Sequence, residues 1–473
     1  MKKKGITVVL FIFIMVISPT VASGVLLIDP ATSSSTQNSD RIFSLENSEE
    51  SIDFYDSIGS IYSSETDDGI DIKVLRYHPE GELFNDGKPV LLFPGLCCNI
   101  NQFLTTSTPK VIEQFGSIRL PDTLALWAQG DEKIEEDPLL YYSYAYYLWS
   151  QGYDPWFANY RGIGYGAMKS EDPHDNRVSL DDFGLYDVKA AVEKVHEITG
   201  KHPYVGGHST GGLSPLMYLQ GTEYAWTGHV RSDSQLVEER NGIKESPQTV
   251  AGFIGLDPAW IPGMTKLLDN ALIWEILDFD LKINIRSLLH FLMDDIPFGA
   301  DMLQCLLTLI SDTYGEDISE ICSYLLNLDT SNVRSDQLFF FLYYAVDTLF
   351  LRTLAHYLDF IAHDTVREFF KNGWFNERYE EPPSPGGWFD FYYYYIDNTY
   401  KMSVPSIIFL AEEENDLMDL VDGDTVIRDV IQGKTQNNYD EWYWVTGAHI
   451  DAPLGLSAPE EIFPRLGDWL ALS

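Results

Sequence analysis

The sequence predicts an α/β protein with a doubly wound, mostly parallel sheet that is interrupted by one large helical cap insertion. Short apolar runs alternate with helical patterns in the first and last parts of the chain, which is typical of βαβ units. Between residues 221 and 400 this alternation is replaced by apolar residues at helical spacing, apart from one strand near 249–256. The length of 473 residues suits one large domain with such an insertion.

The predicted elements follow one another as short strands and longer helices. Asp68-Gly69 marks a turn before the first strand, and Gly200 closes the longest helix. The predicted strands are 70–74, 90–93, 154–159, 204–206, 249–256, 406–411 and 442–445. The predicted helices of the sheet region are 139–149, 181–199 and 213–220.

Two apolar stripes at helical spacing characterise the insertion. The first consists of Leu267, Leu268, Leu272, Ile276 and Leu277, and the second of Leu338, Phe341, Leu342, Ala345 and Leu349. The run 382–387, rich in Pro and Gly, marks the return to the sheet. Such stripes ordinarily pack into a core, so their apolarity alone does not indicate a ligand site.

The composition excludes nucleic acid as a partner. The chain contains 72 Asp and Glu against 31 Lys and Arg, a formal net charge of −41, and such a surface repels phosphate. The apolar fraction of 45% is that of a globular protein, so the acidity does not indicate disorder. The charge indicates solubility or adaptation to a salty medium.

The N-terminus predicts export. Three lysines precede an apolar run from Ile6 to Ile17 and a small-residue stretch that ends at Ser23, the pattern of a secretory signal. A retained N-terminal membrane anchor is the alternative, because no charge occurs between Gly5 and Asp29. The predicted organisation is a signal at 1–23, a flexible Ser- and Thr-rich arm at 24–64, the first part of the sheet core at 65–220, the cap at 221–400 and the second part of the core at 401–473.

Export permits disulfide bonds. Cys305 and Cys322 lie in one helical region of the cap and could be joined, whereas the adjacent Cys97 and Cys98 could not pair without strain. Four buried thiols are the alternative. The spacing of the Cys and His residues predicts no zinc site.

The sharpest motif is Gly207-His208-Ser209-Thr210-Gly211, which follows a predicted strand and precedes a predicted helix. This is the nucleophile elbow Gly-x-Ser-x-Gly in the context that it requires, and it indicates an α/β-hydrolase fold. The sharp turn holds the serine in a strained backbone conformation, and the glycines remove Cβ atoms that would collide. Ser209 is therefore the predicted nucleophile.

A nucleophilic serine needs a base and an acid, which follow it along the chain in the order Ser, acid, His. Among the ten histidines, only His449 lies in a loop beyond the last predicted strands. His208, although next to the serine, should point elsewhere because of the turn. Asp416, after the strand 406–411, is favoured as the acid, and Asp257, at the end of the preceding strand, is the alternative.

Two backbone N–H groups are expected to hold the oxyanion. The loop Pro94-Gly95-Leu96 follows the strand from which the hydrolase fold supplies one donor, and the residue after the nucleophile supplies the other. Leu96 and Thr210 are the predicted donors, and a simple turn at Pro94-Gly95 is the alternative. This chemistry needs neither a metal nor a cofactor.

These residues, in this order, resemble the acid lipases, the gastric and lysosomal lipase-like α/β-hydrolases. The resemblance covers about 65–473 except much of the cap. It rests on 65–69, 94–96, 152–156, 159–162, 182–187, the elbow, 415–417 and 449–451. It implies a triad of Ser209, Asp416 and His449.

The chain departs from the family pattern at three places. Phe93-Pro94-Gly95 replaces the usual His-Gly at the oxyanion loop, and Thr210 replaces the usual Gln. The interval from Ser209 to Asp416 is 416 − 209 = 207 residues, which is longer than usual and leaves the cap, and hence the substrate choice, open.

The sequence therefore predicts an exported serine hydrolase that cleaves carboxylic esters of lipids, such as triacylglycerols or steryl esters. A short-chain carboxylesterase or polyester depolymerase is the first alternative. A non-catalytic lipid-binding protein of the hydrolase fold is the second. The expected partner is a lipid or hydrophobic ester, with contact to a lipid interface through the cap, and the sequence does not indicate an oligomeric state.

Overall fold

A central sheet organises the computed structural model, which describes residues 55, 57–81, 86–260, 281–287, 289–290, 332–363, 365–369, 392–412 and 423–473. The strand order is β1-β2-β4-β3-β5-β8-β11-β12. β1 and β2 are antiparallel and β2 is antiparallel to β4, whereas every neighbouring pair from β4 to β12 is parallel. The strands are Gly59–Glu65, Asp71–Tyr77, Asp154–Ala158, Pro89–Phe93, Tyr204–Ser209, Gly252–Pro258, Ser406–Ala411 and Glu441–Val445.

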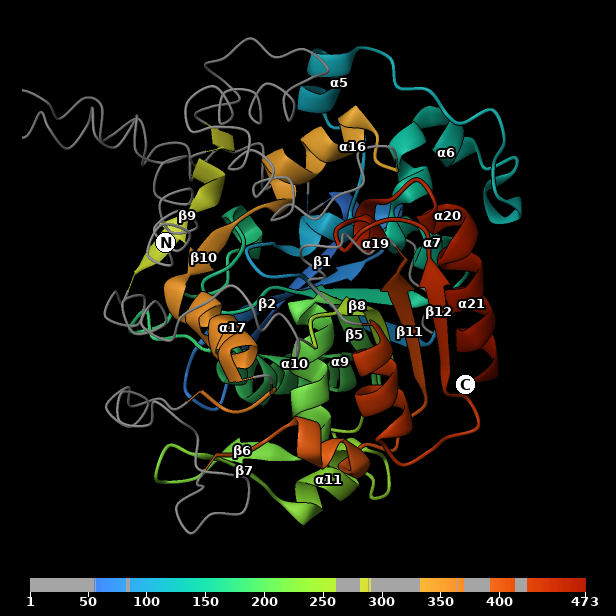
Figure 1. The fold of residues 1–473 in the computed structure, drawn as a ribbon. Coiled ribbons are helices and arrows are strands. Elements are labelled where there is room, and N and C mark those ends of the chain that lie inside the picture. Colours follow the sequence, from blue (N-terminus) through green and yellow to red (C-terminus); the bar gives the residue numbers. More distant parts are fainter. Residues whose placement is uncertain are drawn as a thin grey trace, which may run out of the picture.

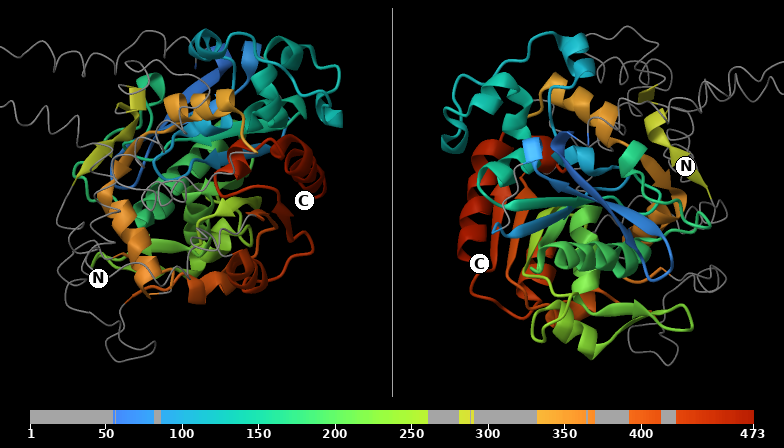
Figure 2. Two further views of the ribbon diagram at one scale, coloured as in Figure 1. Left: turned by 45° about the horizontal axis from the view of Figure 1, so that its top comes forward. Right: turned by 180° about the vertical axis from the view of Figure 1, so that it is seen from behind.

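Each face of the sheet is covered by helices, because both sets of alternating strand side chains are apolar. Leu91 and Phe93 of β3 face a core shared with α9 (Val188–Thr199) and α10 (Thr210–Leu219). Val90 and Leu92 face the opposite core, shared with α7 (Tyr144–Ser150) and α21 (Phe463–Leu472). Figures 1 and 2 show α9 and α10 on one side of the sheet and α21 on the other. The predicted doubly wound α/β-hydrolase fold is confirmed.

The first strand begins earlier than the sequence analysis expected. All of β1 except Glu65 lies within the segment 24–64 that was predicted to be a flexible arm, and its whole length pairs with β2. Tyr55 is buried and its hydroxyl donates to Asn101 Oδ1 over 3.1 Å. The high serine content of this segment led to the prediction of a flexible arm. In the structure, Ile61 and Tyr62 of β1 supply the apolar contacts that hold the strand at the sheet edge.

Two predicted helices differ in detail. The expected helix 139–149 is divided into a 3-10 turn, Pro138–Tyr142, and α7, because the Ser143 side chain accepts the Tyr146 N–H and caps a new helix. The expected helix 181–199 runs through α8 (Leu180–Asp182), a π turn at Phe183–Asp187 and α9.

The described part of the insertion is less helical than predicted. It contains β8, a hairpin of β6 (Thr222–Tyr224) and β7 (Val230–Ser232), and α11 (Ser234–Arg240). The second apolar stripe is helical in α16 (Ser335–Phe340) and the π turn Phe341–Ala345. Leu349, however, lies in strand β10 (Thr348–Phe350), which pairs with β9 (Lys282–Asn284).

The chain returns to helix at α17 (Leu351–His363). The first apolar stripe, the Pro- and Gly-rich run 382–387, the N-terminal signal and the Cys305–Cys322 pair lie outside the described residues. Within the described residues, no helix has the length and apolarity needed to cross a bilayer. Cys97 and Cys98 are both free thiols.

Candidate active site

Ser209 lies where the elbow motif predicts it, at the last residue of β5 and immediately before α10. Its backbone has φ 55° and ψ −115°, a conformation that residues other than glycine rarely adopt. The predicted backbone strain at the serine is therefore present. This conformation turns the chain sharply from strand to helix at the carboxyl end of the sheet.

The glycines of the motif are required by the neighbouring strand β3. A Cβ atom on Gly207 would lie 2.0 Å from the Phe93 carbonyl oxygen, and one on Gly211 would lie 1.9 Å from the same atom. Gly207 also has a positive φ of 152°. The elbow can approach the end of β3 this closely only because both positions lack a side chain.

His449 lies in the loop after β12, as predicted, and contacts a carboxylate. Its Nδ1 is 2.5 Å from Oδ2 of Asp257, and both side chains are buried. Because a carboxylate only accepts hydrogen bonds at neutral pH, Nδ1 carries the proton and Nε2 is the nitrogen that can receive another. This is how an acid orients a catalytic imidazole.

Asp257 comes from strand β8, next to β5 in the sheet. Its φ of 45° is also in the left-handed region, and its Oδ1 accepts the Ala411 N–H over 3.3 Å. The carboxylate that the structure brings to His449 is thus the alternative acid of the sequence analysis. Asp416, the favoured acid, lies outside the described residues.

His208 contacts the loop that carries His449. Its Nε2 lies 2.9 Å from the His449 carbonyl oxygen, and the two ring centroids are 4.7 Å apart. Burial, together with the nearby His449, lowers the pKa of His208 well below its usual range. The neutral ring therefore donates its Nε2–H to the carbonyl and fixes the loop that carries His449.

The two predicted oxyanion donors flank Ser209. A Cβ on Gly95 would lie 3.5 Å from the Ser209 Cβ, so the loop that contains Leu96 passes close to Ser209. The Gly95 N–H donates to Gln102 Oε1 over 2.9 Å, which fixes this loop. Thr210 begins α10, and N–H groups in the first turn of a helix have no partner within it. The helix dipole favours negative charge at the same place.

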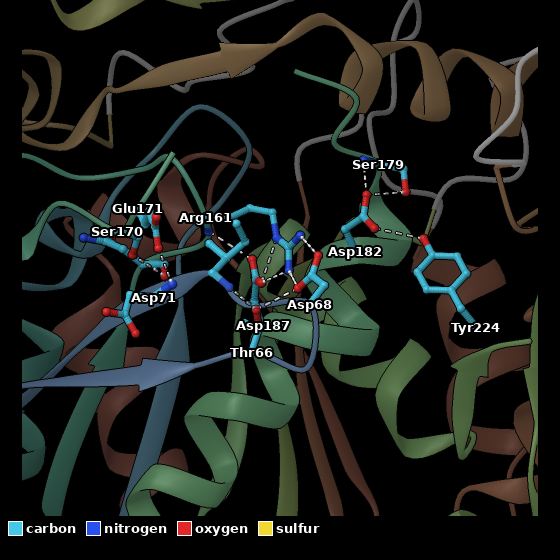
Figure 3. Close-up of polar contacts among 12 residues, drawn as sticks. Thr66, Asp68, Asp71, Arg161, Ser170, Glu171, Ser179, Asp182, Asp187 and Tyr224 are labelled. Atoms are coloured by element: carbon cyan, nitrogen blue, oxygen red, sulfur yellow. Dashed lines mark hydrogen bonds and ion pairs between the residues drawn. The ribbon is translucent and has the colours of Figure 1, made fainter. Parts of the chain in front are cut away.

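Other motifs singled out in the sequence meet in a buried ionic network. Arg161 Nη1 lies 2.7 Å from Asp68 Oδ2, and Nη2 lies 2.7 Å from Asp187 Oδ1. Figure 3 shows Arg161 between these two carboxylates, with Asp182 and Tyr224 nearby. The network joins the β1–β2 turn, the loop after β4 and the start of α9. Its contacts tie the scaffold together rather than reach Ser209.

Three supporting residues were not identified from the sequence: Gln102, Asp347 and Tyr357. Gln102 and Tyr357 act through hydrogen bonds to Gly95 and Thr210, and Asp347 accepts from the Asn99 side chain. The contacts of Asp347 and Tyr357 join residues that only the fold brings together, whereas Gln102 lies seven residues after Gly95 but belongs to no recognised motif. The sequence therefore offered no signal for Asp347 or Tyr357, which lie in the insertion.

The sheet order, the elbow and the buried His449–Asp257 pair define a protein of the α/β-hydrolase fold with a serine at the nucleophile position. No protein-family model matches the chain, and no curated protein matches it. Solved structures similar to it include a putative aryl esterase from Burkholderia cenocepacia, at 12% identity and a TM-score of 0.41, covering 87% of this chain and 98% of that one.

Two further similar structures are an esterase from Pyrococcus furiosus and a juvenile hormone epoxide hydrolase from the silkworm Bombyx mori. The first is 12% identical with a TM-score of 0.36 and covers 89% of this chain and 94% of that one. The second is 12% identical with a TM-score of 0.38 and covers 92% and 85%. At TM-scores below 0.5, these likenesses carry no weight for function, which has to be judged from the side chains.

Proposed function

We propose that the protein is a carboxylic ester hydrolase that works through an acyl-enzyme on Ser209. The observation that carries this proposal is the hydrogen-bonded pair of His449 and Asp257 at the strand ends beside a strained serine. An isolated elbow could be a structural turn. A buried imidazole with a carboxylate on Nδ1 is the arrangement that a serine nucleophile needs.

Each group has one task in the proposed reaction. His449 Nε2 takes the Ser209 hydroxyl proton as Oγ attacks the acyl carbon, and the same nitrogen returns that proton to the leaving alcohol. Water then attacks the acyl-enzyme with His449 as base, which releases the acid and restores the serine. Asp257 holds the imidazole tautomer and stabilises the imidazolium, and the N–H groups of Leu96 and Thr210 bind the oxyanion.

We further propose that the substrates are lipid esters and that the protein is exported. The resemblance to acid lipases and the apolar, aromatic cap sequence support the substrate, and the basic and apolar N-terminus supports the export. On this proposal the cap meets a lipid interface. Short soluble esters are the alternative substrates.

Replacing the nucleophile tests the reaction. Ser209→Ala should lower turnover of p-nitrophenyl esters by about 10⁶-fold, because removing one triad member disables the unit. Ser150→Ala, at the end of α7, is a matched control that should leave turnover unchanged. A wild-type protein without esterase activity, or equal activity in Ser209→Ala, would favour the non-catalytic lipid-binding alternative.

A chain-length series tests the substrate class. Hydrolysis rates should be compared for p-nitrophenyl acetate, butyrate, octanoate and palmitate and for emulsified triolein and cholesteryl oleate. The lipid proposal predicts higher kcat/KM for the long chains and activity on at least one emulsion. Activity confined to acetate and butyrate would instead establish the short-chain esterase.

A further inference from the structure

We propose that Tyr357, on the cap helix α17, is a positioning residue for the oxyanion hole that acts through Thr210. The inference rests on the proposed hydrolase function and adds a residue from the insertion to its machinery. It also assigns a role to the cap other than substrate binding, because part of the cap would be needed for the chemical step.

The contact joins two buried side chains from distant parts of the sequence. The Tyr357 hydroxyl lies 2.8 Å from Thr210 Oγ1, and Thr210 is fully buried. Figure 1 shows α17 beside α10, near the end where that helix begins. Burial raises the pKa of Tyr357 above its usual range, so the hydroxyl keeps its proton at neutral pH.

The peptide unit that carries the Thr210 N–H is fixed at both ends. On one side, the Ser209 carbonyl accepts the Ala259 N–H over 3.0 Å. On the other side, the Thr210 side chain is held by Tyr357. If the second contact is removed, the unit can rotate about the first, and the N–H no longer points steadily at the developing oxyanion.

The Thr210 carbonyl is held by core residues and not by the cap. It accepts from the Ser214 hydroxyl over 3.1 Å and from the Tyr160 hydroxyl over 3.4 Å. These contacts fix the start of α10 through its backbone. Among the hydrogen bonds of the described residues, the one with Tyr357 is what restrains the Thr210 side chain.

The cap segment that leads into α17 also supports the loop that carries the other predicted oxyanion donor, Leu96. The Asp347 N–H donates to the Cys97 carbonyl over 2.7 Å, and Asp347 Oδ2 accepts from the Asn99 side chain over 2.8 Å. Cys97 follows the donor Leu96 and has a positive φ of 57°. Cap residues therefore contact the backbone or side chains beside both predicted donors.

Helix α17 is anchored firmly enough to serve as a support. His356, next to Tyr357, accepts the Leu180 N–H at Nδ1 over 3.2 Å and contacts the Arg367 carbonyl at Nε2 over 2.8 Å. One turn further along, Asp359 forms a buried ion pair with Arg367. These bonds tie the middle of α17 to α8 and to the chain beyond the helix.

A double-mutant cycle tests the inference. Tyr357→Phe removes one oxygen, and Thr210→Val removes its partner while keeping the backbone N–H. Each should lower kcat for a p-nitrophenyl ester by about 10-fold, less than the 10²–10³-fold for loss of an oxyanion donor itself, with KM changed less than twofold. The double variant should be no worse than either single one.

Two further variants separate positioning from structure. Tyr218→Phe removes the hydroxyl of another buried tyrosine, which donates to the Gln248 carbonyl at the other end of α10, and should leave kcat unchanged. Thr210→Ser keeps the hydroxyl and should retain most of kcat. If Tyr357→Phe does not fold, the contrast between Thr210→Val and Thr210→Ser still decides.

The inference is overturned if Tyr357→Phe matches Tyr218→Phe in kcat, if the two losses multiply in the double variant, or if Thr210→Val equals Thr210→Ser. These outcomes all presuppose an active wild type that loses activity in Ser209→Ala. Failure of the proposed function would appear instead as an inactive wild type, so the two failures are distinguishable.

Discussion

The neighbouring strands β5 and β8 each carry a non-glycine residue with a positive φ at their ends, but the two strand ends are stabilised differently. Ser209 ends β5 with φ 55°, and Asp257, one residue from the end of β8, has φ 45°. At the first strand end, close packing against the Phe93 carbonyl enforces the turn. At the second, hydrogen bonds from Ala411 and His449 to the carboxylate hold it.

This difference predicts how the two ends respond to substitution. The serine hydroxyl contributes little to its own placement, because the backbone around it is set by sterics. The Asp257 carboxylate holds its own strand end in place through polar contacts, and it also supplies the negative charge next to His449. Ser209 should therefore be replaceable without loss of fold, whereas substitution at Asp257 should alter both chemistry and local structure.

Substitution of Asp257 should change the activity strongly. Asp257→Asn should lower kcat by about 10⁴-fold, because the amide can hold His449 in the wrong tautomer and cannot stabilise the imidazolium. Asp416→Asn is the matched control and should retain activity within a few-fold. Steady-state hydrolysis of p-nitrophenyl butyrate measures both. A larger loss in Asp416→Asn would transfer the acid role to Asp416.

The next effect concerns the close packing at the β5 end. Gly211→Ala should lower the free energy of unfolding by about 3 kcal/mol, since its Cβ would lie 1.9 Å from the Phe93 oxygen and the backbone must shift. Gly116→Ala places a Cβ in open space at φ 70° and should cost about 1 kcal/mol. Urea unfolding followed by circular dichroism measures both. Equal losses would show that packing does not enforce the elbow.

The smallest effect is a pH dependence at the β5 end. His208 has a pKa lowered by burial, so as pH falls through about 6.5 the unfolded state gains a proton that the folded state does not. The contribution of His208 to stability is therefore full above that pH and is lost as pH falls. His208→Gln should lose less unfolding free energy than wild type between pH 7 and pH 5. Parallel losses in urea titrations would refute this.

His356, whose pKa burial lowers to about 4, acts in the same direction in both proteins. The pH dependence that remains in His208→Gln is therefore expected to come partly from this residue. The informative quantity is the difference between the two proteins at each pH, in which the contribution of His356 cancels.

The contrast between the strand ends also explains what could be predicted from the sequence. The β5 elbow was predictable because packing demands glycines at fixed offsets, and these are visible in five consecutive residues. Asp257 has no such signature, because a hydrogen bond to His449 places no demand on its neighbours in the chain. The expected chain order of serine, acid and histidine is met equally well by Ser209, Asp257 and His449 and by the triad that contains Asp416. The order along the chain could therefore not distinguish the two candidate acids.

The same reasoning applies to the fold. The sheet strands β3, β4, β5, β8 and β11 were predictable because their side chains are buried on both faces of the sheet. β1 was missed because it is an edge strand rich in serine, with Ser60, Ser63 and Ser64, and its partner β2 supplies the pairing. Leu349 was assigned to a helical stripe, but its place in β10 depends on pairing with β9, which lies more than 60 residues earlier in the chain.

The most direct test of the central claim is stoichiometric trapping of the nucleophile. The protein should be treated with a p-nitrophenyl alkylphosphonate, release of p-nitrophenolate should be measured, and the modified peptide should be mapped by mass spectrometry. The triad of Ser209, His449 and Asp257 predicts one equivalent of release, one adduct on Ser209, no adduct in Ser209→Ala and a much slower reaction in Asp257→Asn. No adduct on Ser209 in a protein that hydrolyses esters, or an unchanged rate in Asp257→Asn, would contradict it.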